Sequence, residues 1–328
     1  MDARGLPGGG IENATLLSGG TQNILLRFER GGRSFVLRRP PPHLRRNSNE
    51  TMRREARVLA AIADTGVPHP RLIAACPEED VLGASFYLME PVDGFNPTSG
   101  LPPLHASDPA IRRAMGFSLV DAIASLGAVD HLRVGLEGFG RPDGYLERQV
   151  SRWRGQLESY GELEGYPGPE IPGVERVAEW LDANRPRDYR PGILHGDYHL
   201  SNVMYRPDGP ELAAIVDWEL STIGDPLLDL GWLLATWPGE DGPSAGTIGV
   251  QPWEGFPTAD ELVSRYRDRT VRDLSAIPWY GVLACYKLGI ILEGTHARAC
   301  AGKAPKATGD VLHATTVALF ERALGWIA

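Results

Sequence analysis

Residues 193–225 read ILHGDYHLSNVMYRPDGPELAAIVDWELSTIGD, the most informative stretch of the chain. His195, Asp197 and Asn202 form an H-x-D-x-x-x-x-N array, and Asp217 follows a second apolar run. A short apolar segment ends just before His195, so we expect Asp197 on a tight loop past the end of a strand. Two carboxylates and an amide in this order are typical of magnesium-assisted phosphoryl transfer.

The second half of this stretch predicts a β-hairpin. Residues 202–205 and 211–216 resemble two strands, and the Pro and Gly residues of 206–210 are turn formers. Folding about that turn brings Asn202 beside the 214–215 region with Asp217 just beyond, because antiparallel partners lie about 5 Å apart. Asn202 and Asp217 are therefore expected at one end of the hairpin.

The chemistry expected there follows from the ligand types. Magnesium takes oxygen ligands, often one or two protein groups together with phosphate oxygens, so the Asn202 amide and the Asp217 carboxylate suit it. Asp197, five residues before Asn202, is expected to face the same cavity as the base for an incoming hydroxyl group.

Two other functions fit parts of the same stretch. His195, Asp197 and His199 in HGDYH have ligand types that also bind zinc, as in a metal-dependent hydrolase, although no second His/Asp cluster at ligand spacing completes such a site. A nucleotide-binding pseudokinase is the other alternative. The intact Asp197, Asn202 and Asp217 favour an enzyme over it.

Composition fits an enzyme that acts on a small ligand. The 328 residues are 42% hydrophobic and 23% charged, with a net charge of −9, which disfavours nucleic acid or an anionic membrane as a partner. The three cysteines are expected to be reduced. The longest apolar stretch, residues 279–292, is short for a bilayer span and contains Lys287, so we expect a cytoplasmic protein. The sequence leaves a monomer or a homodimer open.

The first ninety residues predict a small β-rich lobe. Ser18-Gly19-Gly20-Thr21 lies in a glycine-rich turn between two short apolar runs, and residues 34–38 form a further strand. Such a turn brings backbone N–H groups close to phosphate oxygens, although a plain hairpin turn fits equally well.

Apolar residues recur at helical spacing over residues 48–63, where Asn47 and Glu50 resemble a capping pair. Glu55 lies on the apolar stripe, and a carboxylate directed toward a core needs a cation. Arg38, at the end of the preceding strand, is the expected partner, with its guanidinium directed at the phosphates. The alternative is a solvated Glu55 paired with Arg54 or Arg57.

The run of residues 85–89 predicts a strand that leads into Glu90-Pro91-Val92-Asp93-Gly94, an exit from one lobe into the next. Such a connector offers backbone donors and acceptors to an adenine edge. In the larger lobe, Asp229 is expected either to be a charge near a helix start or to support the loop of Asp197.

These segments together resemble the aminoglycoside phosphotransferase family of protein-kinase-like small-molecule kinases, and most closely the branch fused to acyl-CoA dehydrogenases. The resemblance runs in family order through SGGTQNILLRF, SFVLRRPPP, MRREARVLAAI, FYLMEPVDG, ILHGDYHLSNVMY and IVDWELSTIGDPLLDLGW to YKLGIILEGTHARA. It implies an α+β, bilobal protein-kinase-like fold with a small β-rich lobe carrying one main helix (1–92) and a larger, mostly helical lobe (93–328).

The resemblance also implies roles for single residues. Asp197 is the catalytic base, Asn202 and Asp217 hold Mg²⁺, and Glu55 orients the strand cation. From the residues and the resemblance together, we expect ATP to be bound also by Ser18, Gly19, Gly20, Thr21, Arg38, Glu90 and Val92. The family's usual lysine on the strand is replaced by Arg38, which keeps the charge but differs in reach and planarity. The acceptor is expected to be a small-molecule hydroxyl, on a hydroxyacyl-CoA, an antibiotic or an amino alcohol.

Overall fold

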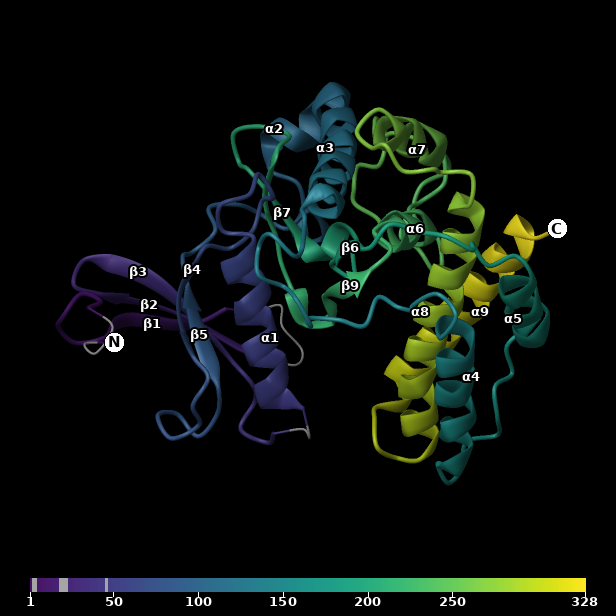
Figure 1. Ribbon diagram of the computed structural model, residues 1–328, viewed down its shortest axis with the longest axis horizontal. Coiled ribbons are helices and arrows are strands. Elements are labelled where there is room, and N and C mark those ends of the chain that lie inside the picture. Colours follow the sequence, from purple (N-terminus) through teal and green to yellow (C-terminus); the bar gives the residue numbers. More distant parts are fainter. Residues whose placement is uncertain (2–4, 18–22, 45–46) are drawn as a thin grey trace.

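The N-terminal part of the protein is a five-stranded antiparallel sheet with one long helix (Figure 1). The structure is a computed structural model that describes residues 1, 5–17, 23–44 and 47–328. The strands follow the order β1-β2-β3-β5-β4. Their bounds are β1 Glu12–Leu16, β2 Ile24–Arg30, β3 Arg33–Arg39, β4 Leu72–Cys76 and β5 Phe86–Met89.

Helix α1, Ser48–Ala61, lies between this sheet and the helical part of the molecule (Figure 1). Its buried face carries Met52, Glu55, Ala56, Val58 and Leu59, which confirms the amphipathic helix predicted from the sequence. The predicted capping pair is wrong. The Asn47 side chain makes no capping hydrogen bond, because its backbone (φ −113°, ψ 10°) lacks the extended conformation that turns a capping oxygen toward the first turn.

The C-terminal part is mostly helical and contains two short antiparallel sheets, β6-β9 and β7-β8 (Figure 1). The four strands are β6 Gly192–Leu194, β7 Val203–Tyr205, β8 Leu212–Ile215 and β9 Thr222–Gly224. The helices are α2 Pro103–Ser107, α3 Pro109–Ala128, α4 Gln149–Ser159, α5 Val174–Ala183, α6 Leu227–Thr236, α7 Ala259–Arg267, α8 Ile277–Cys300 and α9 Lys306–Trp326. The expected α+β, bilobal kinase-like architecture is confirmed. The boundary after Val92 stays a prediction.

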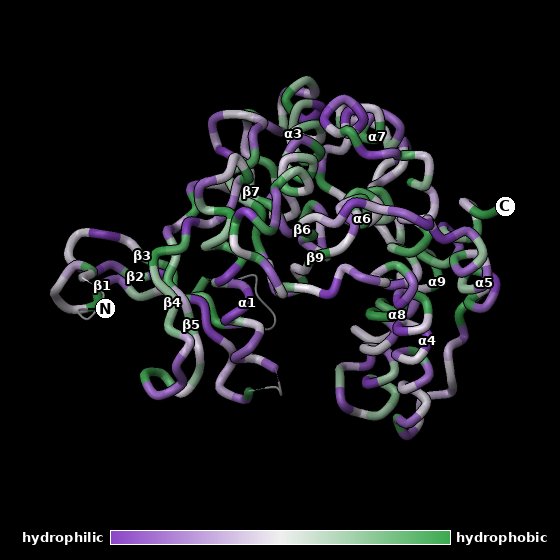
Figure 2. The backbone as a smooth tube through the Cα atoms, in the orientation of Figure 1, coloured by the Kyte–Doolittle hydropathy of each residue, from purple (hydrophilic) through white to green (hydrophobic). Residues whose placement is uncertain are grey.

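One hydrophobic core runs from α1 into the helical part, and every residue of α6 is buried. Figure 2 shows hydrophobic segments around α6 and α8, which pack against each other. Burial on all sides explains why α6 is mostly apolar around its circumference. Within the described ranges, no helix is both long enough and apolar enough to cross a membrane.

Candidate active site

The loop after β6 carries Asp197, and Asp229 of α6 anchors this loop through hydrogen bonds to its backbone. The two carboxylate oxygens of Asp229 accept hydrogen bonds from the backbone N–H groups of His195 (2.7 Å) and Gly196 (2.8 Å). Gly196 has φ +86°, and a Cβ there would lie 2.5 Å from the Leu220 carbonyl oxygen, so the turn requires glycine. Of the two roles expected for Asp229, the structure shows support of the loop.

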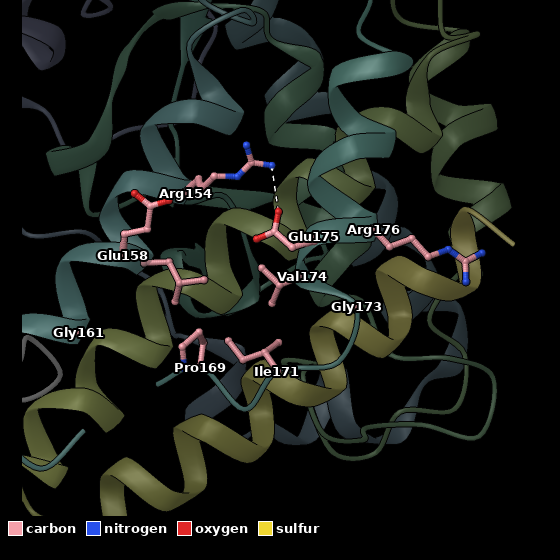
Figure 3. A pocket seen from close by; sticks show the side chains of 10 residues that line it. Arg154, Glu158, Gly161, Pro169, Ile171, Gly173, Val174, Glu175 and Arg176 are labelled. Atoms are coloured by element: carbon pink, nitrogen blue, oxygen red, sulfur yellow. Dashed lines mark ion pairs between the residues drawn. The ribbon is translucent and has the colours of Figure 1, made fainter. Parts of the chain in front are cut away.

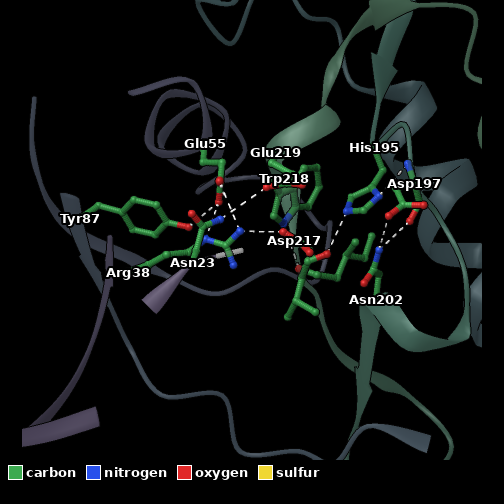
Figure 4. A network of polar contacts seen from close by, with 12 residues as sticks. Asn23, Arg38, Glu55, Tyr87, His195, Asp197, Asn202, Asp217, Trp218 and Glu219 are labelled. Carbon is green, nitrogen blue, oxygen red and sulfur yellow. Dashed lines mark hydrogen bonds and ion pairs between the residues drawn. The ribbon is translucent and has the colours of Figure 1, made fainter. Parts of the chain in front are cut away.

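Asp197 lies within a compact set of hydrogen bonds (Figure 4). Asn202 Nδ2 donates to Asp197 Oδ2 at 2.9 Å, and His199 Nε2 lies 3.2 Å from Asp197 Oδ1. Burial alone would raise the pKa of the Asp197 carboxyl, but the hydrogen bond and charge of His199, with smaller contributions from His195 and Lys287, lower that pKa below its ordinary value. Asp197 is therefore ionised at neutral pH.

The predicted hairpin is confirmed, and it brings Asn202 and Asp217 together. Val203 of β7 pairs with Ile215 of β8, and the Val216 N–H donates to the Asn202 carbonyl at 2.9 Å. The Asn202 side chain uses its Nδ2 toward Asp197, so its Oδ1 stays without a donor from the described residues. Asp217 has φ +67°, a left-handed conformation that is rare for a non-glycine residue and clusters at functional sites.

Arg38 of β3 joins α1 to this hairpin end. Its Nε lies 2.9 Å from Glu55 Oε2, its Nη2 donates to Asp217 Oδ1 at 2.6 Å, and the Tyr87 hydroxyl donates to Glu55 at 2.8 Å. Burial raises the pKa of the Glu55 carboxyl, which Arg38 and Tyr87 oppose. The predicted Arg38–Glu55 pair is confirmed.

The solvated alternative for Glu55 is wrong, because its side chain is 1% exposed. Its two neighbouring arginines have other partners. Arg54 donates to the Ser221 carbonyl at 3.1 Å and Arg57 to the Glu137 carbonyl at 2.7 Å. These bonds hold α1 against the C-terminal part.

Glu219 belongs to the same site, although the sequence reasoning missed it. Its Oε2 accepts a hydrogen bond from Asn23 at 3.4 Å, and Figure 4 shows it beside Asp217 and Arg38. Burial raises the pKa of the Glu219 carboxyl, Asp217 adds to the rise and Arg38 opposes it. The signal was the D-W-E spacing, which places a second carboxylate two residues after Asp217, within the short 3₁₀ turn Trp218–Leu220.

Lys287 of α8 is the second group that sequence reasoning missed. Its Nζ donates to the Gly196 carbonyl at 3.1 Å and lies 4.4 Å from the centroid of the Trp232 ring. Burial lowers the pKa of the Lys287 ammonium to about 8, although Asp197 and Asp229 oppose that fall. A cation from α8 thus supports the loop that carries Asp197.

The structure describes only some of the other positions predicted to bind the nucleotide. In the connector, the Glu90 side chain pairs with Arg33 at 3.0 Å, while the Val92 N–H makes no backbone hydrogen bond within the described residues. Ser18, Gly19, Gly20 and Thr21 lie outside the described residues.

A separate cavity of about 530 Å³ opens between α4 and the start of α5 (Figure 3). Arg154 and Glu175 form an ion pair of 3.3 Å there, with Ile171 and Val174 in the lining. It shares no lining residue with the site of Asp197, so we assign it no part in that chemistry.

The bilobal fold and the Asp197–Asn202–Asp217 arrangement with its Arg38–Glu55 pair define a kinase-like phosphotransferase. The sequence profile of the Phosphotransferase enzyme family matches residues 13–262. The chain belongs to this family.

Known relatives are similar over most of the chain. Acyl-CoA dehydrogenase family member 11 from Homo sapiens is 32% identical over 288 residues, covering 85% of this chain and 35% of its own length. Member 10 from Mus musculus is 30% identical over 311 residues, covering 94% of this chain and 28% of its own. The chain spans about a third of the length of these curated relatives.

Solved structures share the fold. A protein from Ralstonia eutropha JMP134, provisionally assigned as an aminoglycoside phosphotransferase, has a TM-score of 0.81 and 28% identity over 98% of this chain and 92% of its own. Aminoglycoside phosphotransferase APH(4)-Ia, solved with AMP-PNP and hygromycin B, has a TM-score of 0.60 over 93% of this chain and 94% of its own. At 14% identity, this second likeness concerns the fold alone.

Proposed function

We propose that the protein transfers the γ-phosphoryl group of ATP to a hydroxyl group of a small molecule, with Mg²⁺ bound. The observation that carries this proposal is the convergence of Asp197, Asn202 and Asp217 at one hairpin end, directly beside the buried Arg38–Glu55 pair. Base, metal ligands and phosphate-binding cation are the parts that such a reaction needs.

The residues present fit a magnesium ion. Within the described residues no donor reaches Asn202 Oδ1, and the Asp217 side chain is 39% exposed at the neighbouring position. Both are hard oxygen donors that would hold such an ion, and phosphate oxygens and water would complete its ligands. When bound, Mg²⁺ neutralises charge on the phosphate oxygens.

The chain's own groups position the reactants. Asp197, kept ionised by His199 and Lys287, orients the acceptor hydroxyl and takes its proton as the new bond to phosphorus forms. Arg38, held by Glu55, directs its positive charge at the phosphates, which would replace Asp217 as the partner of its Nη2. The Glu90–Val92 backbone serves the adenine edge, and Ser18, Gly19, Gly20 and Thr21 serve the phosphates.

For the acceptor, we propose an alcohol on an acyl-CoA as the first class to test, because the relatives at about 30% identity are acyl-CoA dehydrogenase family members. Amino alcohols and aminoglycosides are the further classes, since a structural neighbour was solved with hygromycin B.

The experiment is a coupled assay of ADP formation over a panel of hydroxyacyl-CoAs, amino alcohols and aminoglycosides, with MgATP. We expect one class to accelerate ADP formation and to yield a phosphorylated product. Nucleotide binding without turnover on any hydroxyl compound would instead support a pseudokinase. ATP-independent hydrolysis by protein containing stoichiometric zinc would support the HGDYH hydrolase, which the structure disfavours because His195 Nε2 faces the Val216 carbonyl at 2.9 Å.

A further inference from the structure

Three potential metal ligands converge where α8 and α9 pack together, outside the site described above. Glu293 and His296 lie one turn apart on α8, and His313 faces them from α9. One ligand atom from each lies within 4.8 Å of the other two. Within the described part of the chain, this is the one group of His, Cys, Asp and Glu residues that comes together in this way.

Glu293 is a fully buried carboxylate with few partners. Its side chain is 0% exposed, Oε1 accepts a hydrogen bond from the Tyr166 hydroxyl at 2.7 Å, and Oε2 lies 2.8 Å from His313 Nδ1. A buried carboxylate is costly unless it is paired with a cation or coordinates a metal. The partner of Oε2 among the described residues is an imidazole, a side chain that is itself a common metal ligand.

His296 leaves coordinating capacity unused. Its Nδ1 is buried and has no hydrogen-bond partner among the residues that the structure describes, and its Nε2 lies 3.6 Å from Cys300 Sγ. A tetrahedral zinc ion with one imidazole and one thiolate ligand separates those two atoms by about 3.6 Å. Gly309 of α9 permits the close approach, because a Cβ there would lie 2.4 Å from the Ala299 Cβ.

We propose that Glu293, His296 and His313 bind a zinc ion, with Cys300 beside the fourth position. Imidazole and carboxylate ligands with a nearby thiol suit zinc rather than magnesium. A Glu and a His three residues apart on one helix are a known ligand spacing in helical bundles. The His296 and His313 rings are stacked with centroids 4.5 Å apart. Zinc binding would therefore turn one ring until one nitrogen of each histidine points at the ion.

A bound ion would fasten α8 to α9 near the turn between them. Through the Tyr166 hydroxyl it would also fix the segment that leads from α4 to α5, because a hydrogen bond of this kind orients a ligating carboxylate. The proposal concerns a different place from the phosphoryl-transfer site and does not depend on the function proposed above.

The test is equilibrium dialysis of the full chain, stripped with a chelator, against zinc sulfate without nucleotide. We expect one equivalent of zinc in the wild type, and at least about a tenfold loss of affinity in Glu293→Gln and in His313→Ala. Tyr166→Phe should weaken binding by about 10-fold, as expected for a group that orients a ligand. Zinc should raise the melting temperature of the wild type and leave that of His313→Ala unchanged.

Two controls locate the site. His131→Ala removes a histidine elsewhere on the chain, and His199→Ala removes the histidine of the alternative HGDYH cluster; both should bind zinc like the wild type. Glu293→Gln preserves the shape of the side chain, so its circular dichroism spectrum should match that of the wild type. Zinc binding that survives in Glu293→Gln and His313→Ala, or that is absent from the folded wild type, would overturn the proposal.

Discussion

Arg38 Nη2 donates to Asp217 Oδ1 at 2.6 Å, so the proposed phosphate-binding cation and the proposed metal ligand are hydrogen-bonded to each other. The same guanidinium is held by Glu55 from α1. Glu55 of α1, Arg38 of β3 and Asp217 at the end of the β7-β8 hairpin therefore form a continuous row of charged contacts across the site (Figure 4). We expect the phosphates of a nucleotide to compete with Asp217 for Arg38, and this couples nucleotide binding to the metal site.

Arg38→Ala should lower kcat/KM for the nucleotide by at least about 100-fold, because the variant loses a charge-assisted phosphate contact. It should also lower the free energy of unfolding by about 3 kcal/mol, since it leaves the buried Glu55 without its cation. Arg38→Lys should restore part of the activity. Steady-state kinetics and urea unfolding measure the two effects. Arg206→Ala, an exposed arginine paired with Asp208, is the matched control; turnover of Arg38→Ala equal to that control would refute the role.

Asn202→Ala should raise the magnesium concentration required for half-maximal rate by about tenfold or more, because one of two protein oxygen ligands is lost. The measurement is a magnesium titration of the initial rate at saturating nucleotide. Asn184→Ala changes an exposed asparagine on another surface and should titrate like the wild type. An unchanged magnesium requirement in Asn202→Ala would show that the amide is not a ligand.

Glu219 should make the affinity for MgATP depend on pH. Burial and the neighbouring Asp217 raise the pKa of its carboxyl, and a bound cation favours the ionised form. The dissociation constant should therefore increase as pH falls through the raised pKa, and Glu219→Gln should flatten this dependence. Calorimetric titrations between pH 5 and 8 measure it, and a pH dependence that is equally steep in both proteins would argue against Glu219.

Lys287 should make stability rise with pH. Its pKa is lowered to about 8 in the folded protein from an ordinary 10.5, so between these values the unfolded chain binds more protons and the folded state gains stability as pH increases. The slope is at most about 1.4 kcal/mol per pH unit. In urea unfolding from pH 7 to 10, the wild type should gain stability relative to Lys287→Met; a constant difference between the two proteins would contradict the lowered pKa.

The predictable parts of the site are those set by local sequence. The hairpin that joins Asn202 to Asp217 follows from two short apolar runs around a Pro/Gly turn, and the position of Glu55 follows from helical periodicity. Lys287 lies 91 residues from the carbonyl that it contacts, so only the packing of α8 against the β6 loop reveals it. The left-handed backbone of Asp217, which sets where its carboxylate and Glu219 lie, has no signature in the residue types.

The Asp197→Asn variant shows whether Asp197 is the base for phosphoryl transfer. In wild type and variant, the dissociation constant for MgATP and the rate of phosphoryl transfer to the best acceptor are measured in parallel. We expect the variant to bind MgATP within about threefold of the wild type and to lose about 10²- to 10⁴-fold in kcat, because a positioned base is removed while the nucleotide contacts remain. A variant that transfers phosphate at the wild-type rate would contradict the assignment of Asp197 and, with it, the proposed mechanism.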